Sequence, residues 1–168
     1  MNHIELLSVL EDAYKRLNAY LAKDSLPEDI VLIVSPVGKR PKYGHFHGDS
    51  WMTTEGETKH EILLAGEYLI ERDALGVLET LVHEMAHLAN HVAGIKYCHS
   101  ATQYHNKKFK VKAEEFGLTV VKTRKGWAET DLTSELKGWL VNEGIVNNLT
   151  PLVNIAKKPK LGINTNFF

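Results

Sequence analysis

The residue pattern predicts a single domain of α+β architecture, in which a small, mostly antiparallel sheet of three or four strands packs against one long helix. Apolar residues recur at helical spacing near both ends and in the middle of the chain, and short β-branched or alternating runs lie between the first two of these segments. A length of 168 residues suits one hydrophobic core and is too short for two domains of ordinary size. The first and last helices should therefore form outer layers.

Local signals set the expected elements. The first helix rests on leucines at helical spacing and ends at the segment DSLPED, because proline cannot continue a helix. Asp73 suits the N-cap of the long helix, which should run to about Ala93. The other elements expected are strands over 30–35, 43–52, 60–67 and 118–123, and helices over 105–117 and 131–144. Little pattern remains from about Thr150, so the domain should span 1–150 and residues 151–168 should form a basic C-terminal tail.

The long helix is apolar around most of its circumference, which is typical of a buried helix. At 100° per residue, seven positions of this helix form a polar stripe within one arc of about 120°. Buried polar groups without partners are costly, so this stripe should line an internal cleft that keeps them solvated. The stripe comprises Gly76, Thr80, His83, Glu84, His87, Asn90 and His91.

Within the stripe, residues 83–87 read HEMAH and fit the pattern H-E-x-x-H. His83 and His87 lie one turn apart on the same helix face, about 6 Å along the axis, so both imidazoles can bind one ion. Catalytic zinc sites use three protein ligands and leave a fourth position for water. Glu84 sits beside the metal and can act as the general base that takes a proton from the zinc-bound water. The pattern therefore predicts hydrolysis of a peptide bond.

The third ligand must come from outside this pair. His91 lies about 12 Å along the axis from His83, too far for one ion, so we expect it to support a ligand or line the rim of the site. Glu114, Glu115, His99 and His105 are all compatible with the third position, and spacing alone does not choose among them.

The segment LVHEMAHLANHVAGIK, followed by YHNKKFKVKAEEFGL, resembles the SprT-like metalloprotease domain, the family of the SprT and Spartan proteases. The resemblance covers about residues 30–125. It implies a zincin-like fold, with His83, His87 and His105 as zinc ligands and Glu84 as general base. The histidine that precedes Phe109 matches the third ligand of the family. Many members also carry a cysteine-rich zinc ribbon, which a chain with one cysteine does not contain.

Charge is unevenly distributed. Residues 1–91 hold 8 basic and 15 acidic side chains, whereas residues 92–168 hold 12 basic and 6 acidic ones. A solvated helix face and a soluble tail explain such lysine runs in most proteins, but a basic surface can also bind nucleic acid. Two functions follow: a zinc-dependent endopeptidase that acts on protein or peptide substrates, including proteins bound to DNA, and a nucleic-acid-associated regulatory protein with a structural zinc ion.

Three further observations concern membrane insertion, the cellular compartment and a possible second metal site. No run of residues has the length and apolarity needed to cross a bilayer, and the N-terminal segment is typical of a helix rather than a secretion signal. Cys98 is the single cysteine, which excludes an internal disulfide and favours a reducing, cytoplasmic compartment. His45 and His47 should share one face of a strand, as surface histidines or, alternatively, at a second metal.

Overall fold

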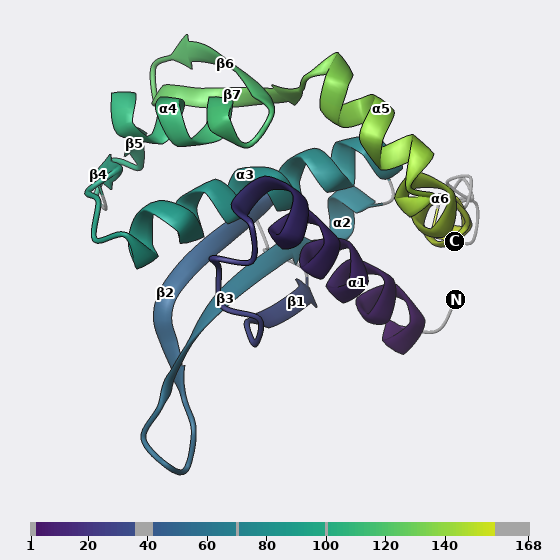
Figure 1. Cartoon of the computed structure of the whole chain (residues 1–168), viewed down its shortest axis with the longest axis horizontal. Helices are drawn as coiled ribbons and strands as arrows, with labels where there is room; N and C mark the ends of the chain where they lie inside the picture. Colours follow the sequence, from purple (N-terminus) through teal and green to yellow (C-terminus); the bar gives the residue numbers. More distant parts are fainter. Residues whose placement is uncertain (1–2, 36–41, 70, 100, 157–168) are drawn as a thin grey trace, which may run out of the picture.

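The long helix α3 (Ala74–Val92) runs through the middle of the molecule between two small sheets (Figure 1). The structure is a computed structural model that describes residues 3–35, 42–69, 71–99 and 101–156. One sheet has the strand order β1-β3-β2, with β1 (Val31–Ser35), β2 (Gly44–Met52) and β3 (Thr58–Ala65). The other has the order β4-β5-β7-β6, with β4 (Cys98–His99), β5 (Tyr104–His105), β6 (Leu118–Thr123) and β7 (Gly126–Leu132). The predicted α+β class is confirmed, but the single predicted sheet is wrong, because the described residues form two sheets.

The first sheet places an edge strand beside α3. β3 pairs in parallel with β1 and antiparallel with β2, so β2 ends the sheet. The register of β2 on β3 shifts between His47 and Trp51. A Cβ on Gly48 would lie 2.3 Å from an atom of the His91 ring, so the absence of a side chain there lets the strand approach α3 closely. This agrees with the bulge or close approach that the glycines of this strand indicate.

Helices cover the remaining sides of α3. The helix α1 (His3–Ala22) lies beside α6 (Ile145–Ala156) at one end of the molecule, and α5 (Ser134–Asn142) precedes α6. The short α2 (Gly66–Leu69) leads into α3, and α4 (Lys107–Glu115) packs on α3 from the side of the second sheet. Among the described residues, no helix has both the length and the apolarity that crossing a membrane requires.

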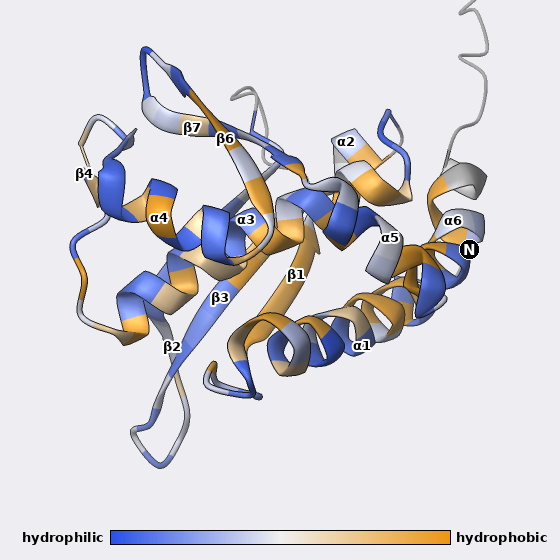
Figure 2. Cartoon of the chain, turned by 45° about the horizontal axis from the view of Figure 1, so that its top comes forward, coloured by the Kyte–Doolittle hydropathy of each residue, from blue (hydrophilic) through white to orange (hydrophobic). Residues whose placement is uncertain are grey.

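The core forms where α1, α3, α6 and the first sheet meet. Hydrophobic residues follow β1 and the inner faces of α1 and α3 (Figure 2). Leu78, Leu81, Met85 and Leu88 on α3 are fully buried, as the apolar circumference of this helix predicts. Asp73 caps α3, since its side chain accepts a hydrogen bond from the backbone N–H of Gly76 over 2.8 Å.

The chain from Gly126 onward departs from expectation. β7 occupies residues 126–130, for which no element was predicted, and the first two residues of the helix predicted over 131–144; α5 begins only at Ser134, where Thr133 supplies the N-cap. The expectation of an extended segment from Thr150 is wrong up to residue 156, because α6 continues there and buries Leu152 and Val153. Residues 157–168, most of the predicted basic tail, lie outside the described part of the chain. The predicted domain boundary at 150 stays a prediction.

Replacing Leu152 tests whether α6 belongs to the folded domain. Leu152 is 6% exposed in the core cluster, so we expect Leu152→Ala to lower the free energy of unfolding by about 2–5 kcal/mol. Val141→Ala serves as the control, because Val141 is 47% exposed and its loss should change stability by less than about 0.5 kcal/mol. Urea denaturation of both variants gives the measurement. Equal stability of the two variants would contradict the packing of α6.

Candidate metal centre

The polar stripe of α3 lines a cleft of about 880 Å³, as the sequence predicts. The cleft lies between the edge strand β2 and the second sheet, and residues of both border it. Thr80, His83, Glu84, His87 and His91 contribute its floor from α3. The stripe is therefore the wall of a cavity rather than an ordinary solvated helix face.

Three imidazole rings meet on this floor. The Nε2 atom of His87 lies 3.2 Å from Nε2 of His83 and 3.0 Å from Nε2 of His105. Nitrogen ligands at tetrahedral positions, each about 2.0–2.1 Å from a zinc ion, lie about 3.3 Å apart. The separation of the rings thus suits one small cation, and these three residues form a group that could hold a metal ion.

Hydrogen bonds on the far side of two rings set which nitrogen carries the proton. The Nδ1 atom of His105 lies 3.0 Å from the carbonyl oxygen of Gln103, which can only accept, so Nδ1 donates and Nε2 keeps its lone pair. Nδ1 of His83 lies 2.9 Å from the hydroxyl oxygen of Thr130, whose own proton goes to the carboxylate of Glu79. Nδ1 of His83 therefore also donates a hydrogen bond, and its Nε2 keeps a lone pair that can bind a metal.

The three Nε2 atoms consequently share at most one proton, on His87. A single proton cannot satisfy three lone pairs that converge within 3.2 Å, whereas a cation between them can. Burial lowers the pKa of His83 to about 3, with a further contribution from His105. Burial likewise lowers the pKa of His87 and of His105 below the usual range. All three rings are thus neutral near pH 7, the form in which histidine binds metal.

Backbone contacts on both sides hold His105 in place. Its N–H donates to the carbonyl of Lys125 over 2.9 Å, and it is paired with Gly126 of β7. Gly126 has φ +77°, and a Cβ there would lie 2.0 Å from the carbonyl oxygen of His105, so only glycine allows this approach. The next residue, Asn106, caps α4 and binds the carbonyl of Lys96 through its side chain. The second sheet therefore positions the third imidazole.

The ring of Phe109 packs against all three imidazoles. Its side chain is fully buried, and its ring centroid lies 4.8 Å from that of His83, 4.5 Å from that of His87 and 4.6 Å from that of His105. A phenyl ring in this place excludes water from one side of the imidazoles and restricts their rotation. The spacing of His105 and Phe109 along the start of α4 thus has a structural reason.

The side chain of Glu84 on α3 lies against the edge strand β2. It is 5% exposed, and its Oε1 atom would be 3.3 Å from a Cβ on Gly44 of β2. Burial, with a smaller contribution from the nearby Glu79, raises the pKa of Glu84 to about 8, while Lys42 acts in the opposite direction. A cation bound to the adjacent imidazoles would favour the ionised carboxylate.

Glu79, Thr130 and Arg72 extend the hydrogen bonds of the site and were missed from the sequence. Glu79 is 8% exposed, accepts from Thr130 and pairs with the Arg72 guanidinium over 2.9 Å. The chain Arg72–Glu79–Thr130–His83 orients the first imidazole from behind. Thr80 accepts a hydrogen bond from Arg72 and donates one to the carbonyl of Gly76, and Asn90 donates to the carbonyl of Ala86 on its own helix.

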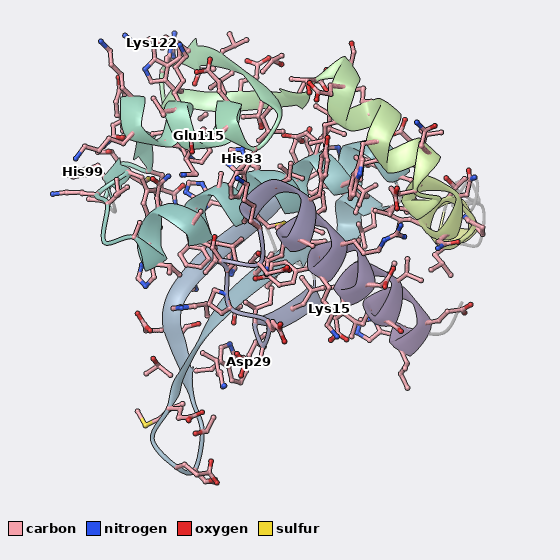
Figure 3. The ribbon with its side chains drawn as sticks, viewed as in Figure 1. Lys15, Asp29, His83, His99, Glu115 and Lys122 are labelled. Atoms are coloured by element: carbon pink, nitrogen blue, oxygen red, sulfur yellow. The ribbon has the colours of Figure 1, made fainter. Side chains whose placement is uncertain are left out.

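The other candidates for the third ligand lie elsewhere. Glu114 and Glu115 form ion pairs with Lys110 and Lys112 on α4. His99 is exposed and bonds to Thr102, and Figure 3 shows it at the edge of the molecule, away from His83. His91 lines the cleft, as expected for a residue of the rim, and its Nε2 lies 2.8 Å from Asp49.

A comparison with protein-family models identifies the family of the chain. The model of the SprT-like family matches residues 10–128, which is more than half of the chain. The chain belongs to the SprT-like family. Its family match includes α3, α4 and the part of β7 next to His105, and so covers all three converging histidines. A search of curated proteins and a search of solved structures found no match to this SprT-like chain.

Thr130→Val tests the support behind His83. Valine keeps the shape of threonine but cannot accept from Nδ1 of His83 or donate to Glu79, so we expect zinc affinity to fall about 10–100-fold. Thr119→Val is the matched control, because Thr119 lies on the neighbouring strand β6 and bonds only to the carbonyl of Asp131. Competition with a zinc-binding dye measures both affinities. Unchanged affinity in Thr130→Val would show that this contact does not tune the site.

Proposed function

We propose that this SprT-like protein is a zinc-dependent endopeptidase with a zincin-like site, in which His83, His87 and His105 hold the metal. The observation that carries the proposal is the convergence of three neutral imidazoles on one point, with Glu84 beside them in a cleft wide enough for a peptide. A purely structural zinc site is usually closed by four protein ligands, whereas three protein ligands leave a position open. The proposal rests on that open position.

Glu84 and Tyr97 have separate roles in the proposed hydrolysis. When bound, the zinc ion supplies Lewis acidity, which acidifies a coordinated water and polarises the scissile carbonyl. Glu84 accepts the proton of the attacking water and returns it to the amine that leaves. Tyr97 borders the cleft, and its ring lies 5.0 Å from that of His87, so its hydroxyl group is the donor best placed to stabilise the developing oxyanion.

The edge strand β2 offers a binding mode for the substrate. Within the described residues no strand pairs with the outer edge of β2, and residues 43–47 border the cleft. An extended peptide can hydrogen-bond to that edge and lie across α3 beside the three histidines. Recognition through the backbone would make cleavage depend more on an unfolded segment of the substrate than on its sequence.

DNA is the partner that the charge distribution favours. Residues 107–125, which form α4, β6 and the turn to β7, hold seven basic and two acidic side chains. Figure 3 shows Lys122 at the outer edge of this layer, and Lys125 of the same turn borders the cleft. A basic surface next to the cleft would bring proteins that sit on DNA to the active site.

Metal content tests the ligand set. We expect the native protein to retain zinc through dialysis and His105→Ala to lose it, since two imidazoles hold zinc far more weakly than three. His99→Ala is the control, because His99 is exposed and outside the cluster. Elemental analysis per chain gives the result. If His105→Ala retained as many equivalents of zinc as the native chain, with the same affinity, His105 would not be the third ligand.

Replacing Glu84 tests the catalytic role. Glu84→Gln keeps the size of the side chain and removes the base, so we expect zinc to stay bound and the rate of peptide cleavage to fall at least about 10²-fold. Glu114→Gln on the exposed side of α4 should leave the rate unchanged. Cleavage of an unfolded protein is followed by electrophoresis, with and without DNA.

A silent Glu84→Gln would favour the other function, a nucleic-acid-associated regulator whose zinc is structural. That alternative predicts DNA binding that weakens steeply with salt and depends on the lysines of residues 107–125. If the enzyme cleaved its substrate equally well without DNA, the protease function would stand and DNA would no longer be part of the proposal.

A further inference from the structure

His45 and His47 of β2 border the same cleft, but they lie on the face of the strand opposite to α3. A Cβ at Gly44 would meet Thr80 and Glu84 of α3, and one at Gly48 would meet His91, so the even positions of this strand face α3. Side chains alternate along a strand, so His45 and His47 project from the opposite face of the sheet. Glu61 of β3 is paired with His47 across the ladder and shares that face.

These three side chains converge. Nε2 of His45 donates a hydrogen bond to Oε1 of Glu61 over 2.9 Å, so a cation would replace the proton of that bond, and Nδ1 of His47 lies 3.8 Å from the same oxygen. The two imidazole rings are stacked with centroids 4.3 Å apart. The two distances bracket the separation of about 3.3 Å expected between ligands of one zinc-sized ion. The three ligand atoms all lie within 4.8 Å of one another.

A neighbouring residue orients the carboxylate. The indole N–H of Trp51 donates to Oε2 of Glu61 over 2.7 Å, which leaves Oε1 directed toward the two histidines. The Glu61 side chain is 12% exposed and that of His45 is 23% exposed, so both are held by their surroundings, while His47 is 61% exposed and open to solvent. The cluster therefore has two fixed ligands, one accessible ligand and room for water.

We propose that His45, His47 and Glu61 form a second divalent-cation site, separate from the centre on α3. Two imidazoles and one carboxylate select transition metals such as Zn²⁺, Co²⁺ or Ni²⁺ over Mg²⁺ and Ca²⁺, which prefer all-oxygen ligands. All three ligands come from paired strands, so the fold supplies their positions before any metal arrives. Solvent completes the coordination on the side of His47.

The neighbouring group of Asp49, His60 and His91 does not compete for this role. Nδ1 of His60 accepts a hydrogen bond from the backbone N–H of Asp49 over 3.1 Å, which uses the lone pair that a metal would need. His91 bonds to the Asp49 carboxylate over 2.8 Å. These bonds tie the irregular part of β2 to the end of α3, and so give the second group a structural function.

A cation at His45, His47 and Glu61 would fix the edge strand. It would link β2 to β3 just before the register shift at His47, and so hold the strand segment that borders the cleft. The predicted role is stabilisation of β2 rather than a second hydrolytic centre. At a metal concentration 100-fold above Kd, the midpoint of thermal unfolding should rise by roughly 5–10 °C.

Metal stoichiometry tests the site. Titration of the full chain with Zn²⁺ and with Co²⁺ should show two equivalents, and His47→Ala should lose one of them with at least a tenfold loss of affinity. His47 is the exposed ligand, so this variant should fold. His105→Ala should lose the other equivalent, and the double variant should bind none. His60→Ala is the matched control and should keep both equivalents.

The outcomes separate this site from the proposed catalytic centre. If the centre on α3 held no metal, the native chain would bind one equivalent and His47→Ala none, and the site on the sheet would stand. The proposal is overturned if His47→Ala binds as many equivalents as the native chain with the same affinity. Loss of an equivalent in His60→Ala but not in His47→Ala would also overturn it, because the ligands would then belong to the Asp49 group.

Discussion

Desolvation of three imidazoles around one point governs the design of this molecule. The rings of His83, His87 and His105 converge on Nε2 separations of 3.0 and 3.2 Å in a site whose burial lowers all three pKa values. In that environment no ring accepts a second proton near neutral pH, so protons do not compete with a cation. The nitrogen lone pairs therefore remain directed at one another, and a cation bound between them would remove the repulsion among these acceptors.

Two layers must meet for this convergence to exist. α3 supplies two rings at fixed spacing from a helix that the core holds on most sides. The third ring arrives from the second sheet, through the contact of His105 with Lys125 and Gly126 at the turn into β7. The same strand supplies Thr130, which sets the tautomer of His83. β7 therefore contributes to the site in two ways: it positions the ring of His105 and it sets the protonation of His83, so its loss would disturb two of the three imidazoles together.

Periodicity alone was enough to predict α3, its burial and the cleft, because a helix apolar on nearly all sides has few places to lie. His83, His87 and Glu84 followed from their spacing on that helix. His105 could not be chosen from spacing, since the return of the chain depends on the close approach of Gly126 to its carbonyl group. Thr130 and Glu79 were missed because β7 was not recognised: GWAETDL mixes small, charged and apolar residues without clean alternation. The helix α6 was missed at a proline, Pro151, that the structure accommodates inside the helix.

The pKa shifts of the site have opposite signs and one cause. Burial lowers the pKa of His83 to about 3 and raises that of Glu84 to about 8, because in each case it disfavours the charged form. Without a metal, the imidazoles are therefore neutral near pH 7, and the raised pKa of Glu84 favours its protonated form, which cannot act as a base. A dication held by the imidazoles would favour the carboxylate and so would create the base at the moment it supplies the Lewis acid. Under the proposed function, a chain without metal lacks both the Lewis acid and the general base. The burial of Glu84 couples the two, because it makes ionisation of the carboxyl group depend on the bound cation.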